Sequence, residues 1–262
     1  MKKLYTIFFI ILLFFGCASN PLTGKSTMAF VSNNTLFPTA FAQYDEFLSE
    51  NTVITDTAEA DMVARVGERI AEAAQKWLAA EGSPHYLDDY RWEYKLVEDD
   101  AVNAWCMPGG KIVVYTGILP VTQTETGLAV VMGHEVSHAL LNHGQQRMSA
   151  GVLQQLGAVV VSVATDSDLV MAAYGVGSAL LGTLPFSRSH ESEADHYGLI
   201  LMAIAGYDPS EAVPFWERMA AMGGGGSLEF LSTHPSSTTR IRQLRDWTPE
   251  AKQKAAGFGV QF

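Results

Sequence analysis

The chain has 262 residues, of which 48% are hydrophobic, and its 28 acidic residues outnumber its 17 basic ones to give a formal net charge of −11. A chain of this length can form one large domain with its own hydrophobic core. Because a strongly acidic protein repels the phosphates of DNA and RNA, we expect no nucleic-acid partner.

Residues 1–16 have the pattern of a signal peptide. Lys2 and Lys3 form a basic start, and Ile7–Phe15 is an unbroken apolar run followed by a small residue. The run is too short to cross a bilayer as a helix of the mature protein. We therefore expect cleavage after residue 16.

Cys17 is the predicted site of lipid attachment. Leu13–Cys17 resembles a bacterial lipobox, in which the cysteine is lipidated and becomes the first residue of the mature protein. In that pattern the non-acidic Ala18 and Ser19 indicate sorting to the outer membrane. Lipidation leaves Cys106 as the remaining cysteine, so we expect no intramolecular disulfide. The expected location is the periplasmic face of an outer membrane, held there by the lipid anchor.

The mature chain is predicted to begin with a tether and to continue as one domain. Residues 17–55 are interrupted by proline, glycine and asparagine, and we interpret them as a lipidated tether with a short helix near Phe41–Ser49. Residues 56–262 form the domain. Its first element is a core helix, because apolar residues recur at helical spacing between Met62 and Trp77.

A small antiparallel sheet is predicted after this helix. Arg91–Val97 alternates between apolar and polar residues, as a half-buried strand does. Val102–Met107 and Lys111–Thr116 flank a Pro-Gly-Gly turn and read as a hairpin. Together with the helices, these strands indicate an α+β fold that is mainly helical.

The exposed edge of the hairpin has two possible roles. In a peptidase, the backbone at Asn103, Ala104 and Trp105 is where an extended substrate would pair as an added strand. The alternative is a purely structural hairpin.

The stretch Gly133–His138 carries the strongest chemical signal. His134 and His138 are four residues apart, so on a helix they lie on one face and can bind one metal ion. Glu135 is turned away from this pair but can reach a water at the metal and act as a general base. This H-E-x-x-H arrangement is typical of zinc peptidases.

The residues around this motif indicate where its helix begins and ends. Thr122–Glu125 reads as a capping box at the start, and Gly144 is placed to end the helix. His143 is rotated off the ligand face, so we expect it at the surface near the helix end.

The stretch Val152–Leu184 is strongly apolar but is interrupted by glutamines and aspartates. We expect buried helices beside the active site. Leu169–Leu184, its uninterrupted part, is too short to span a bilayer, but a segment that touches the membrane remains the alternative.

A third protein ligand is needed, because two histidines and a water leave zinc one short of four. The metzincin pattern is excluded, because Leu141 and Gly144 stand where it needs a glycine and a histidine. Glu191 and Asp195 begin a later predicted helix and share a face of it, so Glu191 can bind the metal while Asp195 holds a ligand histidine. Acids at a helix start can alternatively just complement its dipole.

At this point the chain resembles the gluzincin metallopeptidases related to HtpX and the CAAX prenyl proteases. The resemblance rests on both metal motifs and on further matching stretches: Asn103–Trp105, Pro108–Ile112, Thr116–Gly117, Ala205–Pro209, Leu231–Pro235 and Arg240. The similarity is greatest to the soluble periplasmic branch typified by LoiP and BepA, with mitochondrial Oma-type proteases as further kin.

The resemblance implies a role for each matching residue. One zinc ion would be bound by His134, His138 and Glu191 and supported by Asp195. Glu193 would not be a ligand.

A histidine before a proline lies over the zinc in this family, and here it is His234, with Arg240 beside it. It would act either as a fourth ligand that closes the resting site or as a donor to the oxyanion of the reaction. Gly223–Gly226, just upstream, would form a flexible link that lets this loop move.

The resemblance thus implies a gluzincin metallopeptidase domain with a small antiparallel sheet beside the H-E-x-x-H helix. We expect a zinc-dependent endopeptidase that cleaves unfolded or misassembled envelope proteins, with the outer-membrane assembly machinery as a possible partner. Two alternatives stay open: a chaperone-like or assembly-factor lipoprotein with a latched zinc site, and a narrow processing protease with one client.

Overall fold

The structure is a computed structural model that describes residues 17–164, 184–222, 230–231, 234 and 238–262. The predicted signal peptide, most of the predicted segment Leu169–Leu184 and the predicted glycine link Gly223–Gly226 lie outside these residues. The chain runs through the following elements: β1 (Cys17–Ser19), β2 (Ser26–Met28), α2 (Asn33–Glu50), β3 (Val53–Ile54), α3 (Ala58–Ala80), β4 (Glu93–Val97), β5 (Ala104–Met107), β6 (Lys111–Tyr115), η1 (Thr116–Ile118), α4 (Leu119–Thr122), α5 (Glu125–Leu140), α6 (His143–Ala164), α8 (Leu184–Ile204), η3 (Pro209–Glu211), α9 (Ala212–Ala221) and α11 (Thr238–Ala256).

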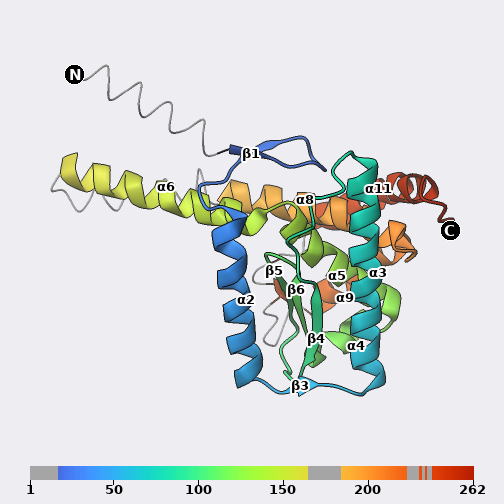
Figure 1. The fold of residues 1–262 in the computed structure, drawn as a ribbon. Coiled ribbons are helices and arrows are strands. Elements are labelled where there is room, and N and C mark those ends of the chain that lie inside the picture. Colours follow the sequence, from blue (N-terminus) through green and yellow to red (C-terminus); the bar gives the residue numbers. More distant parts are fainter. Residues whose placement is uncertain (1–16, 165–183, 223–229, 232–233, 235–237) are drawn as a thin grey trace.

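The fold is α+β and mainly helical, with one four-stranded sheet beside α5 (Figure 1). The strand order is β3-β4-β6-β5. β5 and β6 form the predicted hairpin, whose turn needs glycine because Gly109 and Gly110 have φ of 86° and 89°. The prediction of a purely antiparallel sheet was wrong. β4 pairs with β6 in parallel, so the sheet is mixed.

Both faces of the sheet are covered. Leu96 and Val114 face the main core, which includes α3 and α5. The next residue along each strand, Val97 and Tyr115, faces the opposite way and packs with Tyr44 of α2. This arrangement follows from the alternation of side chains along a strand. Figure 1 shows α2 and α3 on opposite sides of the sheet.

The N-terminal stretch is more structured than the tether that we predicted. β1 and β2 form a small antiparallel hairpin, and α2 is much longer than the expected helix near Phe41–Ser49. Phe37 and Tyr44 of α2 are buried against the rest of the protein. The hairpin also contacts the metal-motif helix, because the Asn20 side chain donates to the Leu140 carbonyl at 2.7 Å. This stretch therefore packs on the domain.

α5 lies at the centre of the molecule, and α8 crosses it closely. Fourteen of the sixteen residues of α5 are buried, so nearly every face of the helix contacts other elements. A Cβ atom at Gly198 would lie 2.9 Å from backbone atoms of Gly133 and His134. Real side chains do not tolerate such a distance, so glycine at this crossing lets the two backbones meet. Glu191 and Asp195, which were expected to begin this helix, lie in its interior, because α8 already includes Leu184. The crossing holds them against the histidines of α5.

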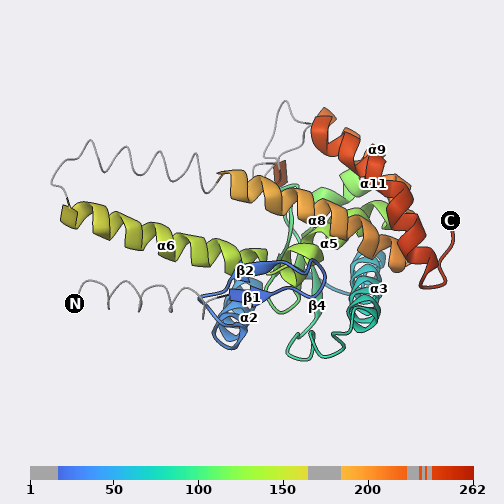
Figure 2. The same cartoon turned by 90° about the horizontal axis from the view of Figure 1, so that it is seen from above.

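α6 leaves the body of the protein instead of packing beside the active site. Figures 1 and 2 both show it projecting away from the sheet. Leu156 and Val159 are 55% and 59% exposed, so the prediction of buried helices is wrong for this part of Val152–Leu184. Among the residues that the structure describes, no helix combines the length and apolar character needed to cross a membrane.

Candidate metal centre

His134 and His138 lie on α5 as the spacing predicts, but the ends of this helix differ from the prediction. Thr124 caps the start, because its side chain accepts a hydrogen bond from the Gly127 N–H at 3.0 Å. Thr122 belongs to the preceding α4, so the predicted capping box is wrong. The helix ends at Leu140, well before Gly144, and the chain turns at Asn142.

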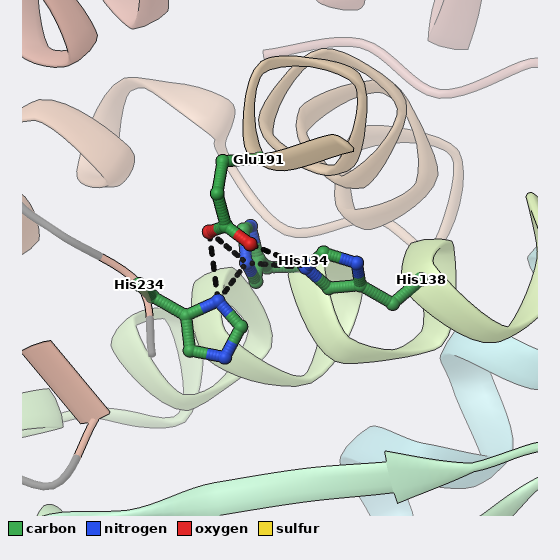
Figure 3. A group of neighbouring side chains, drawn as sticks. All are labelled: His134, His138, Glu191 and His234. Carbon is green, nitrogen blue, oxygen red and sulfur yellow. Dashed lines mark hydrogen bonds and ion pairs between the residues drawn. The ribbon is translucent and has the colours of Figure 1, made fainter. Parts of the chain in front are cut away.

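Four side chains from three segments converge on one point (Figure 3). His134 and His138 come from α5, Glu191 from α8, and His234 from the segment before α11. One ligand atom of each lies within 4.8 Å of the others. The Nε2 atoms of the two α5 histidines are 3.1 Å apart, and each is 3.3 to 3.4 Å from a Glu191 oxygen.

This geometry fits a zinc ion. Tetrahedral ligands at about 2.1 Å from the metal lie about 3.4 Å from one another. The spacings between His134, His138 and Glu191 are close to that value. Two imidazoles and one carboxylate also form the donor set of catalytic zinc sites, which leave a fourth position for water or substrate.

His234 reaches into this fourth position. Its Nδ1 lies 2.7 Å from Glu191 Oε2 and 3.1 Å from His134 Nε2. The other ring nitrogen, Nε2, lies 3.4 Å from Glu135 Oε1. His234 therefore lies between the other three clustered side chains and the predicted general base, Glu135.

Glu135 is buried beside the cluster without belonging to it. Its Oε1 atom is fully enclosed, yet no residue within the described part of the chain donates a hydrogen bond to it. Leaving a buried carboxylate oxygen without a hydrogen bond costs free energy, and the long 3.4 Å contact with His234 Nε2 compensates only in part. A water or a substrate at the metal is the partner that this position offers.

Asp195 and Arg240 hold His134 from behind. Asp195 Oδ1 accepts from His134 Nδ1 at 2.9 Å and from Arg240 Nη2 at 2.6 Å. Arg240 also donates to the His234 carbonyl at 3.2 Å, and its guanidinium lies 3.5 Å above the Trp216 ring. Asp195 thus lies behind His134, and Arg240 links it to the His234 backbone.

Protons and metal compete for this cluster. Burial lowers the pKa of His134, but hydrogen bonds to Asp195 and Glu191 outweigh burial and raise the pKa to about 9. Burial would raise the pKa of Glu191, but its three histidine contacts lower that pKa far below its usual value. For His138, burial lowers the pKa well below the usual histidine value. A metal that binds at neutral pH therefore displaces a proton from His134.

His143 is the residue that the sequence analysis placed wrongly. It was expected at the surface, but it is completely buried, and its Nδ1 lies 2.8 Å from Nδ1 of His138. Its Nε2 lies 3.2 Å from Glu193 Oε2. Asn142 explains the error, because its φ of 57° breaks the helical path and redirects the next residue. The sequence carried one signal of this break, because Asn142 precedes His143 and asparagine adopts left-handed backbone angles more readily than most residues.

The predicted substrate edge is the outer side of β5, where the carbonyl of Val102, just before the strand, accepts a hydrogen bond from the Phe230 N–H at 3.1 Å. β5 is the last strand in the sheet order, and it packs against α5. The backbone N–H of Tyr115 in β6 donates to the Asn103 carbonyl. Because successive residues of an antiparallel strand point their backbone groups to opposite sides, those of Ala104 and Cys106 point away from β6. The Ala104 N–H is covered by the side chain of Asn103 at 2.9 Å, and the Trp105 ring packs on α2 aromatics.

Comparisons with known proteins agree with this site. A sequence profile of peptidase family M48 matches residues 59–248, which include all four clustered side chains. The mitochondrial metalloendopeptidase OMA1 of Schizosaccharomyces pombe is 41% identical over 172 residues, which are 64% of this chain and 50% of that protein.

Two bacterial proteins are more distant. The metalloprotease YcaL of Escherichia coli is 30% identical over 164 residues, covering 58% of this chain and 61% of YcaL. The β-barrel assembly-enhancing protease of Yersinia pestis is 28% identical over 174 residues, covering 62% of this chain and 35% of that protein. The greater similarity to OMA1 reverses the order that we expected. The chain spans about half the length of the OMA1 relative.

Proposed function

Because the chain belongs to peptidase family M48, we propose that it is a zinc-dependent endopeptidase that cleaves unfolded or misassembled proteins of the cell envelope. The observation that carries this proposal is the convergence of His134, His138 and Glu191 next to the buried, unbonded Oε1 of Glu135. The set combines a metal site with a general base, which is what hydrolysis of a peptide bond requires.

Each side chain has a task in this reaction. When bound, zinc supplies a Lewis acid that polarises the scissile carbonyl and acidifies a water molecule. Glu135 accepts the proton from that water and passes it to the leaving amine. Asp195 keeps the His134 Nδ1 proton in place, so that Nε2 of His134 is free to bind the ion.

The outer edge of β5 is the proposed substrate site. Backbone groups of Ala104 and Cys106 face away from β6 there, but Ala104 is buried and its N–H is held by the Asn103 side chain. An extended peptide would therefore add to the sheet as a fifth strand after displacing that side chain. Pairing through the backbone requires an unfolded substrate, because a folded protein has already paired its own backbone groups. Backbone pairing also depends little on the amino-acid sequence of the substrate, which suits a quality-control protease. One relative is named for enhancing β-barrel assembly, which supports envelope proteins and their assembly machinery as partners.

The proposal is tested by offering one protein in two states. We expect the enzyme to cleave a permanently unfolded form, such as a reduced and alkylated protein, and to leave the folded form intact. Intact mass analysis of both mixtures over time measures this difference. Equal cleavage of both forms would contradict recognition of unfolded chains, and cleavage of neither would favour the chaperone-like alternative.

We propose that His234 is a latch that closes the metal site, and the same assay tests this role. With Nδ1 in the ligand cluster, it would complete four protein ligands and leave no position for water. Opening would then require a substrate that favours the state with His234 displaced. His234→Ala should therefore cleave the unfolded substrate about tenfold faster than the parent, if the latched state holds about nine in ten molecules.

The alternative role of His234 predicts the opposite sign. As a donor to the oxyanion, its loss should lower the rate by about a hundredfold or more. His85→Ala is the control, because His85 is an exposed loop histidine whose ring pairs with Asp88 at the surface. A His234→Ala enzyme slower than both parent and control would rule out the latch.

We propose that lipid attached to Cys17 anchors the protein to the periplasmic face of the outer membrane. The lipobox-like stretch Leu13–Cys17 supports this location. Cys17→Ser should move the protein from the membrane fraction to the soluble fraction, because serine has no thiol to carry the lipid and the anchor is lost. Cys106→Ser is the matched control and should stay with the membranes. Firm membrane association of Cys17→Ser would contradict a lipid anchor.

A further inference from the structure

The two metal histidines of α5 are supported in different ways. His134 Nδ1 is hydrogen-bonded directly to Asp195 at 2.9 Å. His138 Nδ1 lies 2.8 Å from Nδ1 of His143, so a second histidine takes the place that a carboxylate has beside His134. His143 Nε2 then lies 3.2 Å from Glu193 Oε2. A row of three hydrogen-bonded side chains thus runs from the buried His138 and His143 to the partly exposed carboxylate of Glu193.

We propose that His143 and Glu193 are positioning residues, which fix the tautomer and orientation of His138 so that its Nε2 can bind the metal. This inference rests on the zinc site of the proposed function and deepens it. Neither residue is one of the four clustered side chains, so both would act on the metal through His138, which His143 contacts directly.

The positions of the protons follow from the geometry. His138 Nε2 faces the cluster, 3.3 Å from Glu191 Oε1, and must be unprotonated to bind a metal. The single proton of the neutral ring is then on Nδ1, which donates to His143 Nδ1. His143 therefore carries its own proton on Nε2 and donates it to Glu193. The hydrogen bonds therefore all point the same way, from His138 through His143 to the negatively charged carboxylate of Glu193.

The surroundings hold this chain in place. The His190 ring stacks on His143, with centroids 4.0 Å apart and planes 7° apart, and His190 Nε2 lies 3.2 Å from Gln146 Oε1. At the other end, Glu193 forms an ion pair with Lys25 of the N-terminal hairpin. His143 can therefore neither rotate nor tilt freely, which is what a residue that orients a ligand needs.

One helix would then supply every acid that binds the metal or supports a metal ligand. Glu191 of α8 lies in the ligand cluster, Asp195 supports His134 directly, and Glu193 supports His138 through His143. The spacing along the helix indicated roles for Glu191 and Asp195 but none for Glu193. Glu193 remains outside the ligand set, but it acquires a role that the facing directions on a helix did not indicate.

Two replacements of His143 separate hydrogen bonding from packing. His143→Phe keeps a flat ring that can stack on His190 but has no atom to accept the His138 proton. His143→Asn loses the ring but offers Oδ1 close to the position of Nδ1. We expect His143→Phe to weaken zinc binding about 10- to 100-fold, as loss of a metal ligand's supporting partner generally does. His143→Asn should stay within about threefold of the parent, because its acceptor is kept.

The measurement is the zinc dissociation constant of the full chain, obtained by competition with a chromophoric chelator, and it needs no peptidase activity. His196→Phe is the control, since His196 lies on α8 and pairs with Glu250 at the surface. It should bind zinc like the parent. Glu193→Ala tests the same chain from its partly exposed end, and should also weaken binding about tenfold.

The outcomes separate this inference from the proposed function. A parent protein that binds no zinc would overturn both. If the parent binds zinc and His143→Phe binds it equally well, or if His143→Asn is as weak as His143→Phe, the positioning role is wrong and the zinc site stands. If His143→Phe does not fold, unchanged zinc binding by Glu193→Ala overturns the inference on its own.

Discussion

Replacing Glu135 with glutamine should lower the rate of peptide cleavage by about 10²- to 10⁴-fold while zinc stays bound. Glutamine has nearly the same shape but cannot accept and carry the proton. Zinc should remain, because Glu135 is outside the ligand cluster. The prediction is checked by measuring initial cleavage rates on an unfolded protein together with metal content of the same sample.

A matched control shows whether the effect belongs to this position. Glu217→Gln makes the same chemical change on α9, where the side chain is half exposed and pairs with Arg245 at the surface. It should cleave at the parent rate. A Glu135→Gln enzyme that cleaves at the parent rate would contradict the mechanism, even with zinc in place.

The metal ligands were predictable because their geometry is local. His134 and His138 lie four residues apart on one helix, and so do Glu191 and Asp195 on another. The helical repeat alone places each pair on one face. That α5 and α8 meet at these faces depends on Gly133 and Gly198, and it could be expected only from the resemblance to a family.

The partners of the strands could not be predicted from local patterns. Hydrophobic alternation shows which residues form a strand, but not which neighbour the strand pairs with. β4 therefore seemed to extend the hairpin as an antiparallel strand, whereas it lies parallel to β6. A clue was present in Lys111–Tyr115, where the last four residues are apolar or aromatic. Such a run indicates burial on both faces, and α2 covers the second one.

His143 shows how one backbone angle can hide a functional residue. The helical projection assumed that α5 continues to Gly144, which would turn His143 away from His138. The left-handed conformation of Asn142 ends this projection and starts a new helix at His143. The position of a residue beyond such a break cannot be predicted by extending the helix and is known only from the structure.

Removing zinc should abolish cleavage completely, which is the other large effect that we expect. Without the ion, Glu135 has no acidified water to deprotonate, and the scissile carbonyl has lost its Lewis acid. The loss should be reversible, because the surrounding fold rests on a large apolar core and on α5–α8 packing.

The most direct test of the zinc endopeptidase is a titration of zinc into protein stripped by a chelator, with the initial cleavage rate of an unfolded protein measured after each addition. The four clustered side chains can hold one ion, so the rate should rise in proportion to added zinc and level off at one equivalent per chain. Addition of Mg²⁺ or Ca²⁺, which prefer oxygen ligands, should restore nothing. Cleavage at the full rate by the stripped protein, before any zinc is added, would contradict the account.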